Sequence, residues 1–188
     1  ETATPAYAAA DLLSQLEHDV LASAVLITTS RALAEQVSAC IEEQMASLSR
    51  REIIEQSLAN YSGAVIVPTM GEGFAIANAI APEHLEIVTQ EPRALLPQIK
   101  NAGAVFLGAY SPEPLGDYMA GPDHVLPTSG TARFFSPLSV DSFLKTMSVI
   151  EFDRSSLEPI ASEIITLAET EKLTAHANSV RVRFPELG

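Results

Sequence analysis

The stretch of sequence that decides the fold is Ala64-Val65-Ile66-Val67-Pro68, followed by a segment from Met70 to Ile80 and then by Leu85-Glu86-Ile87-Val88. The first and last segments are short apolar runs rich in β-branched residues, which is typical of buried strands. The middle segment has the length and apolar spacing of a helix. Two strands joined through a helix are parallel, so this stretch predicts a βαβ unit.

The rest of the first two thirds of the chain repeats this alternation. Further strands are predicted for Val25–Thr29 and Ala104–Gly108, and further helices for Thr4 to about Ala22, Ser30 to about Leu48, Ser49 through Leu58, and about Pro92 to Ile99. Strands that alternate with helices predict an α/β fold, in which a parallel sheet carries helices on both faces.

The C-terminal third has a different character. Residues 110–137 are rich in proline and glycine, and we interpret them as a long ordered loop that builds a site, because structureless loops of this length are uncommon. Beyond it, helices are predicted over residues 140–150 and 155–181. We therefore expect an α/β domain that carries the site over residues 1–137, and a helical C-terminal arm over residues 138–188.

The composition argues against several classes of partner. A formal net charge of -13, from 11 Lys and Arg against 24 Asp and Glu, would repel nucleic acid and anionic membranes but tolerates a small or cationic ligand. Cys40 is the single cysteine, which excludes an intramolecular disulfide and a thiolate-rich zinc finger. The sequence has no apolar run long enough for a transmembrane helix and does not start like a signal peptide. A cytoplasmic protein is expected.

All four histidines stand near acidic or amide side chains, in Gln15-Leu16-Glu17-His18, Pro82-Glu83-His84, Pro122-Asp123-His124 and the stretch from Glu171 to His176. We interpret the set as one metal or acid/base site gathered from distant segments. Gln15 and His18 are three residues apart in a predicted helix, so both side chains project from one face and can meet one ion. Glu83 and His84 fall between a helix and a strand, where a break in the backbone can aim both into a cleft.

Each position also has an ordinary structural interpretation. A helix-surface histidine is usually solvated, a Glu-His pair in a loop can be a plain ion pair, and a loop aspartate such as Asp117 or Asp123 is usually a turn former. The segment Gly71-Glu72-Gly73-Phe74 is the nearest approach to a dinucleotide-binding fingerprint. It lacks the third glycine, so we interpret it as the start of a helix.

Five longer motifs follow one another over nearly the entire chain. They are Asp11–His18, Ala81–Ile87, Asn101–Gly108, Gly116-Asp117-Tyr118 through His124–Thr128, and Leu173–His176. Together they resemble the C-terminal half of histidinol dehydrogenase, the zinc enzyme that ends histidine biosynthesis. The resemblance implies a partial Rossmann-like, aldehyde-dehydrogenase-like α/β fold with a layered parallel sheet. It also implies oxidation of L-histidinol to L-histidine through L-histidinaldehyde, with one hydride passed to NAD in each of two steps.

Carried over position by position, the resemblance assigns a role to each candidate residue. The implied zinc ligands are Gln15, His18, Asp117 and His176. The implied substrate contacts are these four together with His84, His124 and Glu171. His84 would be the base that removes the alcohol proton, and Glu83 would activate water for attack on the aldehyde. Zinc would fix and polarise the substrate, while the hydride goes to the cofactor.

The family is also a homodimer in which the C-terminal arm crosses over and delivers Glu171 and His176 to the partner. The N-terminal, NAD-binding part of the family has no counterpart in this sequence. We therefore expect a fragment that does not bind NAD properly alone and that leaves a sheet edge or an apolar face unpaired. Two alternatives stay open: a catalytically silent module that binds zinc and an imidazole, and a His/carboxylate metal hydrolase in which Glu83 activates zinc-bound water.

Overall fold

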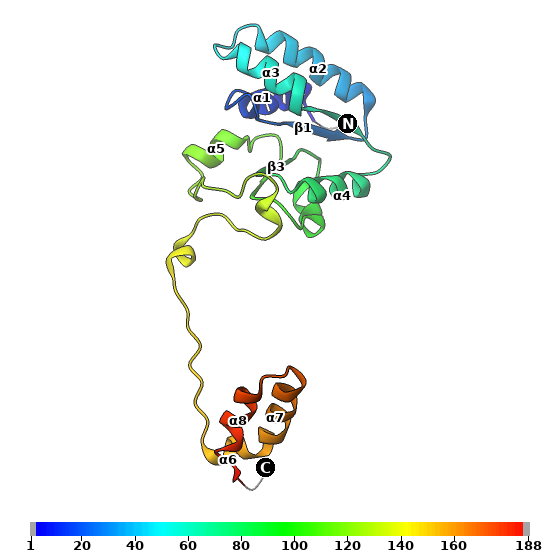
Figure 1. The fold of residues 1–188 in the computed structure, drawn as a ribbon. Helices are drawn as coiled ribbons and strands as arrows, with labels where there is room; N and C mark the ends of the chain where they lie inside the picture. Colours follow the sequence, from blue (N-terminus) through cyan, green and yellow to red (C-terminus); the bar gives the residue numbers. More distant parts are fainter. Residues whose placement is uncertain (1–2, 186–188) are drawn as a thin grey trace. The chain divides into compact units, whose positions relative to one another are not determined.

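The structure, a computed structural model, describes residues 3–185 (Figure 1). The chain divides into two compact units, unit 1 (Glu1–Phe143) and unit 2 (Leu144–Gly188). In the part of the chain that the structure describes, no helix is both long enough and apolar enough to cross a membrane.

Unit 1 alternates helices with short strands. Its elements are α1 (Pro5–Leu16), β1 (Val25–Thr28), α2 (Arg31–Met45), α3 (Arg51–Tyr61), β2 (Gly63–Ile66), α4 (Met70–Ile80), β3 (His84–Ile87), the 3-10 helix η1 (Pro92–Gln98), β4 (Ala104–Leu107), α5 (Glu113–Tyr118), η2 (Thr131–Arg133) and η3 (Val140–Phe143). The predicted strands and the helix α4 are confirmed. Local signals account for the helix starts, because the hydroxyls of Ser30 and Thr69 accept hydrogen bonds from the backbone N–H groups of Leu33 and Glu72.

The strands pair in parallel, as predicted, but not in one sheet. β1 pairs with β2, and β3 pairs with β4, so the described residues form two separate two-stranded sheets. Residues of both β1 and β3 line a single cavity of about 670 Å³. No ladder of hydrogen bonds joins the two pairs within the described residues, so the expectation of one layered sheet was wrong for this part of the chain.

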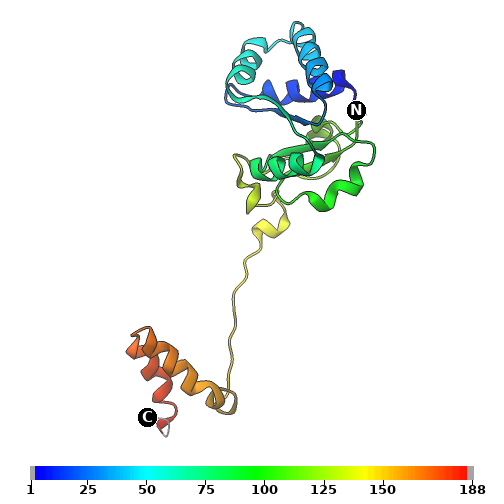
Figure 2. The same ribbon diagram turned by 90° about the vertical axis from the view of Figure 1, so that its right-hand side faces the viewer.

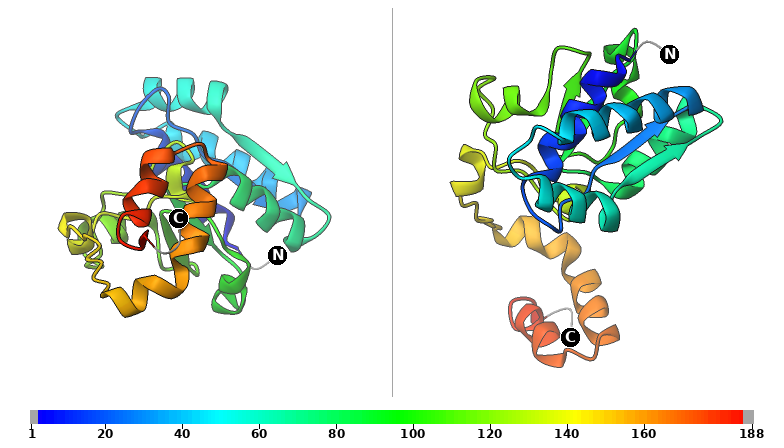
Figure 3. Two further views of the ribbon diagram at one scale, coloured as in Figure 1. Left: turned by 60° about the horizontal axis from the view of Figure 1, so that its bottom comes forward. Right: turned by 90° about the horizontal axis from the view of Figure 1, so that it is seen from above.

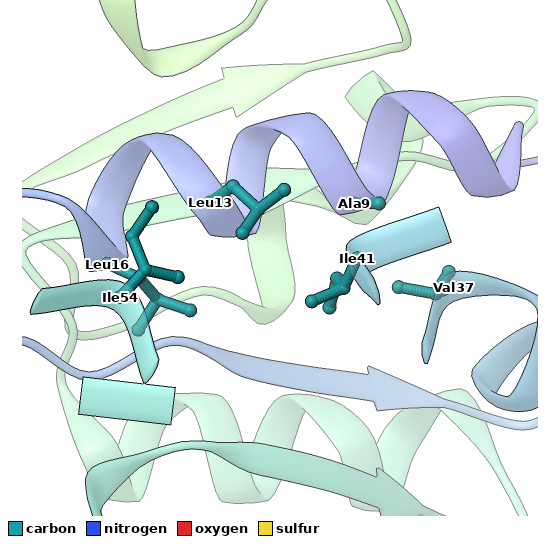
Figure 4. Packing of buried hydrophobic residues seen from close by; sticks show 6 residues of the cluster. All are labelled: Ala9, Leu13, Leu16, Val37, Ile41 and Ile54. Atoms are coloured by element: carbon teal, nitrogen blue, oxygen red, sulfur yellow. The ribbon is translucent and has the colours of Figure 1, made fainter. Parts of the chain in front are cut away.

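The core of unit 1 lies where α1 packs against α2 and α3 (Figures 3 and 4). Figure 4 shows its six buried side chains, which are Ala9, Leu13, Leu16, Val37, Ile41 and Ile54. Leu26 of β1 packs against the same cluster, so one face of the first sheet is covered by these helices. Each fully buried Leu or Ile stabilises the fold by roughly 1.5–3 kcal/mol. The core therefore fixes α1, which carries Gln15.

The opposite face of the first sheet is covered by α4. A Cβ at Gly73 would lie 3.2 Å from Cγ2 of Ile27 and 3.5 Å from Cγ2 of Val67, so this glycine allows close approach of helix and strand. Ile27 and Leu26 are adjacent and point to opposite faces, as a strand requires. The prediction of helices on both faces is confirmed for this sheet.

The first helix is shorter than predicted. α1 ends at Leu16 instead of near Ala22, which leaves His18 just beyond the helix. The Oδ1 atom of Asp19 accepts a hydrogen bond from the N–H of Leu21, a local turn that competes with further helix. The buried hydroxyl of Ser57 in α3 donates to the carbonyl of Leu16 at 3.0 Å and holds the last turn in place.

Unit 2 begins with an extended segment where a helix was predicted. Of residues 140–150, only η3 is helical, and residues 144–153 form neither helix nor strand (Figure 2). The apolar side chains of this region are 57–86% exposed; they are Val140, Phe143, Leu144, Met147, Val149, Ile150 and Phe152. An apolar stripe stabilises a helix only when it is buried, so the predicted helix does not form here.

The predicted second helix of the arm is also divided. It is broken into α6 (Arg154–Leu157), η4 (Glu158–Ile160), α7 (Ala161–Thr170) and α8 (Thr174–Arg181). The turn after α7 has Lys172 at a φ of 62°, and α7 and α8 lie side by side (Figures 1 and 3). The shared core is Ala161, Ile165, Ala168, Ala177, Val180 and Phe184. One straight helix would leave this apolar stripe in water, which explains the turn.

We predict that Gly103→Ala destabilises the protein by about 1–3 kcal/mol through overpacking. A Cβ at Gly103 would lie 2.6 Å from the backbone carbonyl oxygen of Glu83, which cannot move aside as a flexible side chain does. The matched control is Gly63→Ala, because a Cβ there meets nothing within 4 Å. Thermal unfolding followed by circular dichroism measures the difference, and equal midpoints for the two variants would contradict this packing.

Candidate functional site

The end of α1 and the start of β3 meet through one side-chain contact. Oε1 of Gln15 lies 3.0 Å from Nδ1 of His84, across 69 positions of sequence. Since an amide oxygen can only accept, this geometry assigns the ring hydrogen to Nδ1 and leaves Nε2 as the basic nitrogen. The contact joins two of the motifs that the sequence singled out.

His84 is largely enclosed, with 13% of its side chain exposed. Its Nε2 lies 3.8 Å from Oε1 of Glu113, and its ring centre lies 6.0 Å from that of Phe106. Burial lowers the pKa of His84, an effect that the negative charge of Asp117 opposes and His18 reinforces. His84 is therefore a neutral base at neutral pH.

Glu83 is the second titratable group of the site. Burial raises the pKa of Glu83; the charge of His18 lowers it, and that of Asp117 raises it further. Its backbone is fixed, because the carbonyl oxygen of Glu83 accepts a 2.8 Å hydrogen bond from the N–H of Ala104. His18 and Asp117 act on both Glu83 and His84, so the structure gathers these side chains in one region of unit 1.

Asp117 lies in a helix and not in the predicted loop. α5 occupies residues 113–118 within the Pro/Gly-rich stretch, so Glu113 and Asp117, four residues apart, share one helix face. A Cβ at Gly116 would lie 2.8 Å from the ring of Phe106, so the glycine lets α5 sit directly on β4. The sequence prediction missed this helix because Pro112 and Pro114 suggested a loop.

Three of these side chains offer donor atoms to one point. A ring nitrogen of His84 and carboxylate oxygens of Glu113 and Asp117 lie within 4.8 Å of one another. Glu113 is 5% exposed, and its Oε1 is buried without a hydrogen-bond partner. Nitrogen and oxygen donors of this kind suit zinc, and an orphaned buried carboxylate oxygen is the kind of atom that a cation satisfies. The described residues therefore fit a zinc ion.

Sequence reasoning overlooked Glu113 and its neighbour Glu86. Oε1 of Glu86 accepts a 3.1 Å hydrogen bond from the backbone N–H of Glu113. Burial, together with the charge of Asp11 and a hydrogen bond to it, raises the pKa of Glu86 to about 8. Burial, then the hydrogen bond and charge of Asp117, raise the pKa of Glu113 to about 7. Glu113 was recognisable in the sequence only as an acid four residues before Asp117.

Of the three remaining predicted site residues, His124 lies in unit 1, and Glu171 and His176 lie in unit 2. His124 is exposed in an irregular segment, next to a turn in which Oδ1 of Asp123 accepts from the N–H of Val125. Glu171 caps the C-terminal end of α7 and His176 lies in α8, so they stand on opposite sides of a turn instead of on one helix. Both belong to unit 2 and are exposed.

The cluster opens onto the cavity of about 670 Å³ noted above. Its polar lining includes Gln15, Glu83, His84, Glu86 and Glu113, and its apolar lining comes from α1, β1 and α4. This volume lies in the range of small-molecule sites. The concentration of carboxyl groups favours a cationic ligand.

We predict that Glu86→Gln stabilises the protein as pH rises. The folded pKa of about 8 exceeds the ordinary 4.5, so ionisation of Glu86 costs the folded state stability progressively from pH 4.5 to 8. A glutamine keeps the acceptor for the N–H of Glu113 but never ionises. After allowance for solvent screening, its gain should be about 1–2 kcal/mol at about pH 9 and small at about pH 5. Urea unfolding at both pH values measures it; Glu91→Gln, at an exposed carboxylate, is the control. A Glu86→Gln variant that is less stable than wild type at the higher pH would contradict a folded-state pKa of Glu86 raised to about 8.

Comparison with known proteins gives a consistent result. The family model for histidinol dehydrogenase matches residues 1–184. The histidinol dehydrogenase of Caldanaerobacter subterraneus subsp. tengcongensis is 60% identical over 184 residues, which are 98% of this chain and 43% of the relative. That of Bacillus subtilis is 55% identical over 183 residues, covering 97% and 43%. The crystal structure of histidinol dehydrogenase from Elizabethkingia anophelis superposes with a TM-score of 0.84 at 37% identity, over 99% of this chain and 43% of that chain. This chain thus spans less than half the length of these relatives, and it belongs to the histidinol dehydrogenase family.

Proposed function

We propose that this chain carries the metal site, the substrate site and the catalytic bases of an NAD-dependent enzyme that oxidises L-histidinol to L-histidine. The observation that carries the proposal is the cluster in unit 1, where His84 contacts Gln15 and lies beside Asp117. The relatives are named histidinol dehydrogenases, and oxidation of histidinol is a step of histidine biosynthesis. The chain covers 43% of the first of those relatives.

Zinc is the metal that we assign to the cluster. The residues that would hold it, carried over from the family resemblance, are Gln15, His18, Asp117 and His176; Asp117 also belongs to the triad with His84 and Glu113 whose donor atoms converge. When bound, zinc would polarise the substrate, with the imidazole and amine of histidinol as its further ligands. Glu171 and His124 complete the grip on the substrate, and the carboxylates of the site attract its ammonium group.

His84 performs the proton transfers of both oxidations. Its Nε2 takes the proton of the substrate hydroxyl as a hydride leaves the same carbon for NAD, which gives the aldehyde and one reduced cofactor. The lowered pKa of His84 keeps the ring neutral and ready to accept this proton. The same nitrogen takes a hydroxyl proton from the aldehyde hydrate when a second hydride leaves.

Glu83 prepares the second oxidation. Its carboxylate takes a proton from water as the water oxygen adds to the aldehyde carbon, which forms the hydrate. Burial raises the pKa of Glu83 towards the range in which a carboxylate is an effective base. His84 thus accepts the hydroxyl protons, and Glu83 accepts the proton of water.

The glycines at the start of α4 do not form a binding site for a nicotinamide dinucleotide. Gly71 and Gly73 lie in the first turn of α4, where Gly73 packs on Ile27 and Glu72 stands beside its cap Thr69. A carboxylate at this helix start would repel a pyrophosphate. No step of the reaction is therefore assigned to this turn.

The active form is a homodimer with exchanged arms. Unit 2 supplies Glu171 and His176, and the exposed apolar residues of 140–152 provide the surface that a second copy buries. Exposed apolar runs of this kind mark interaction sites. The exchange gives each metal site residues from both chains.

We predict that two substitutions in the complete polypeptide separate metal binding from chemistry. His84→Asn should keep zinc but lower histidinol oxidation by about 10²-fold or more, since a base has been removed. Asp117→Ala should lose most of the zinc, because a ligand is missing. Elemental analysis and NAD reduction measure the two effects, with Glu91→Ala, at an exposed position outside the site and the arm, as control. Wild-type protein that binds zinc and histidinol without reducing NAD would favour the silent module.

The exchange of arms predicts complementation between two inactive variants. His84→Asn and Glu171→Gln polypeptides should each be nearly inactive alone, but a mixed dimer would restore one intact site. Random assembly after co-expression then gives about a quarter of wild-type activity. Absence of any recovery, in dimers shown by mass spectrometry to be mixed, would mean that each arm serves its own chain.

A further inference from the structure

Glu113 is a buried acid that belongs to the converging triad but not to the ligand set proposed for zinc. Its side chain is 6% exposed, and its Oε1 has no hydrogen-bond partner although it is fully enclosed. A buried carboxylate oxygen without a partner lowers the stability of the fold, and a role at the site would account for its presence.

The position of Glu113 is closely determined. The carboxylate of Glu86 holds its backbone N–H at 3.1 Å. A side-chain hydrogen bond joins it to Asp117, one turn further along α5. The helix itself rests on Phe106 through Gly116, where a Cβ would be 2.8 Å from the ring. The unpartnered oxygen is therefore held in place.

That oxygen faces Nε2 of His84, the ring nitrogen that makes no hydrogen bond within residues 3–185. Gln15 fixes the imidazole at Nδ1, but a ring held at a single atom can pivot about the contact. Oε1 of Glu113 lies 3.8 Å from Nε2, on the other side of the ring. A carboxyl group on this side of the ring favours the orientation in which Nε2 points towards it whenever Nε2 carries a proton.

We propose that Glu113 is a positioning residue that orients the imidazole of His84 for proton transfer. The inference rests on the proposed function, because it concerns how the base of that reaction is aimed. The carboxyl group acts through His84: once Nε2 has taken the substrate proton, Oε1 of Glu113, 3.8 Å away, is placed to accept from the new N–H. Misplacement of a reacting group by about 1 Å can cost on the order of 10²-fold in rate, so loss of this contact should appear in kcat.

The test uses a complete histidinol dehydrogenase polypeptide that contains this chain. Glu113→Met fills the same space without offering an acceptor, and Glu113→Gln keeps an oxygen and an N–H for Nε2. We expect Glu113→Met to lower kcat by about 10- to 100-fold, with KM for histidinol and zinc content changed by less than about threefold. Glu113→Gln should stay within about fivefold of wild type, and Glu113→Asp, shorter by one methylene, should fall between them.

The controls make each outcome decisive. Glu91→Met, at an exposed carboxylate outside the cluster, should leave kcat, KM and zinc unchanged. Unchanged kcat in Glu113→Met overturns the inference, and so does loss of zinc or a raised KM with normal kcat, which would make Glu113 a ligand instead. Should the Met variant not fold, the ratio of Gln to Asp decides: equal kcat for the two overturns the proposal. A wild-type enzyme that does not oxidise histidinol refutes the proposed function itself, whereas an active wild type with a fully active Met variant refutes only the role of Glu113.

Discussion

The 3.0 Å hydrogen bond from Nδ1 of His84 to Oε1 of Gln15 is the constraint on which the site depends. It joins the end of α1 to the first residue of β3, and neither partner can shift without moving the other. α1 is fixed by the apolar core and by the hydroxyl of Ser57 on the carbonyl of Leu16, while β3 is fixed by its parallel pairing with β4. The apolar packing of unit 1 therefore fixes the orientation of the His84 imidazole through Gln15.

The carboxyl groups around this contact are costly to assemble. Burial raises the pKa values of Glu83, Glu86 and Glu113, and neighbouring carboxylates raise them further. Such a cluster is tolerated when it retains protons or meets a cation. Zinc and a substrate with an ammonium group both supply positive charge. The carboxyl groups that lower the stability of the fold therefore favour binding of the proposed metal and substrate.

The parts of the fold that were predictable carry their own local signals. Each of these signals lies within a few residues of sequence: the β-branched residues of the strands, the cap at Thr69 and the apolar spacing of α4. The missed features depend on distant contacts instead. α5 forms in a proline-rich stretch because Gly116 packs on Phe106. Glu113 is recognisable as a site residue only from its distance to His84 in the folded chain. The amphipathic pattern of residues 140–150 was misleading, because an apolar stripe forms a helix only where something covers it.

The close packing of α5 on Phe106 restricts which residues can replace Gly116. Phe106 touches the space at Gly116 on one side and lies 6.0 Å from the ring of His84 on the other. Any side chain introduced at position 116 would push the aromatic ring, and through it disturb the base. Substitution of Gly116, a residue to which no chemistry is assigned, should therefore change the surroundings of the His84 ring through Phe106.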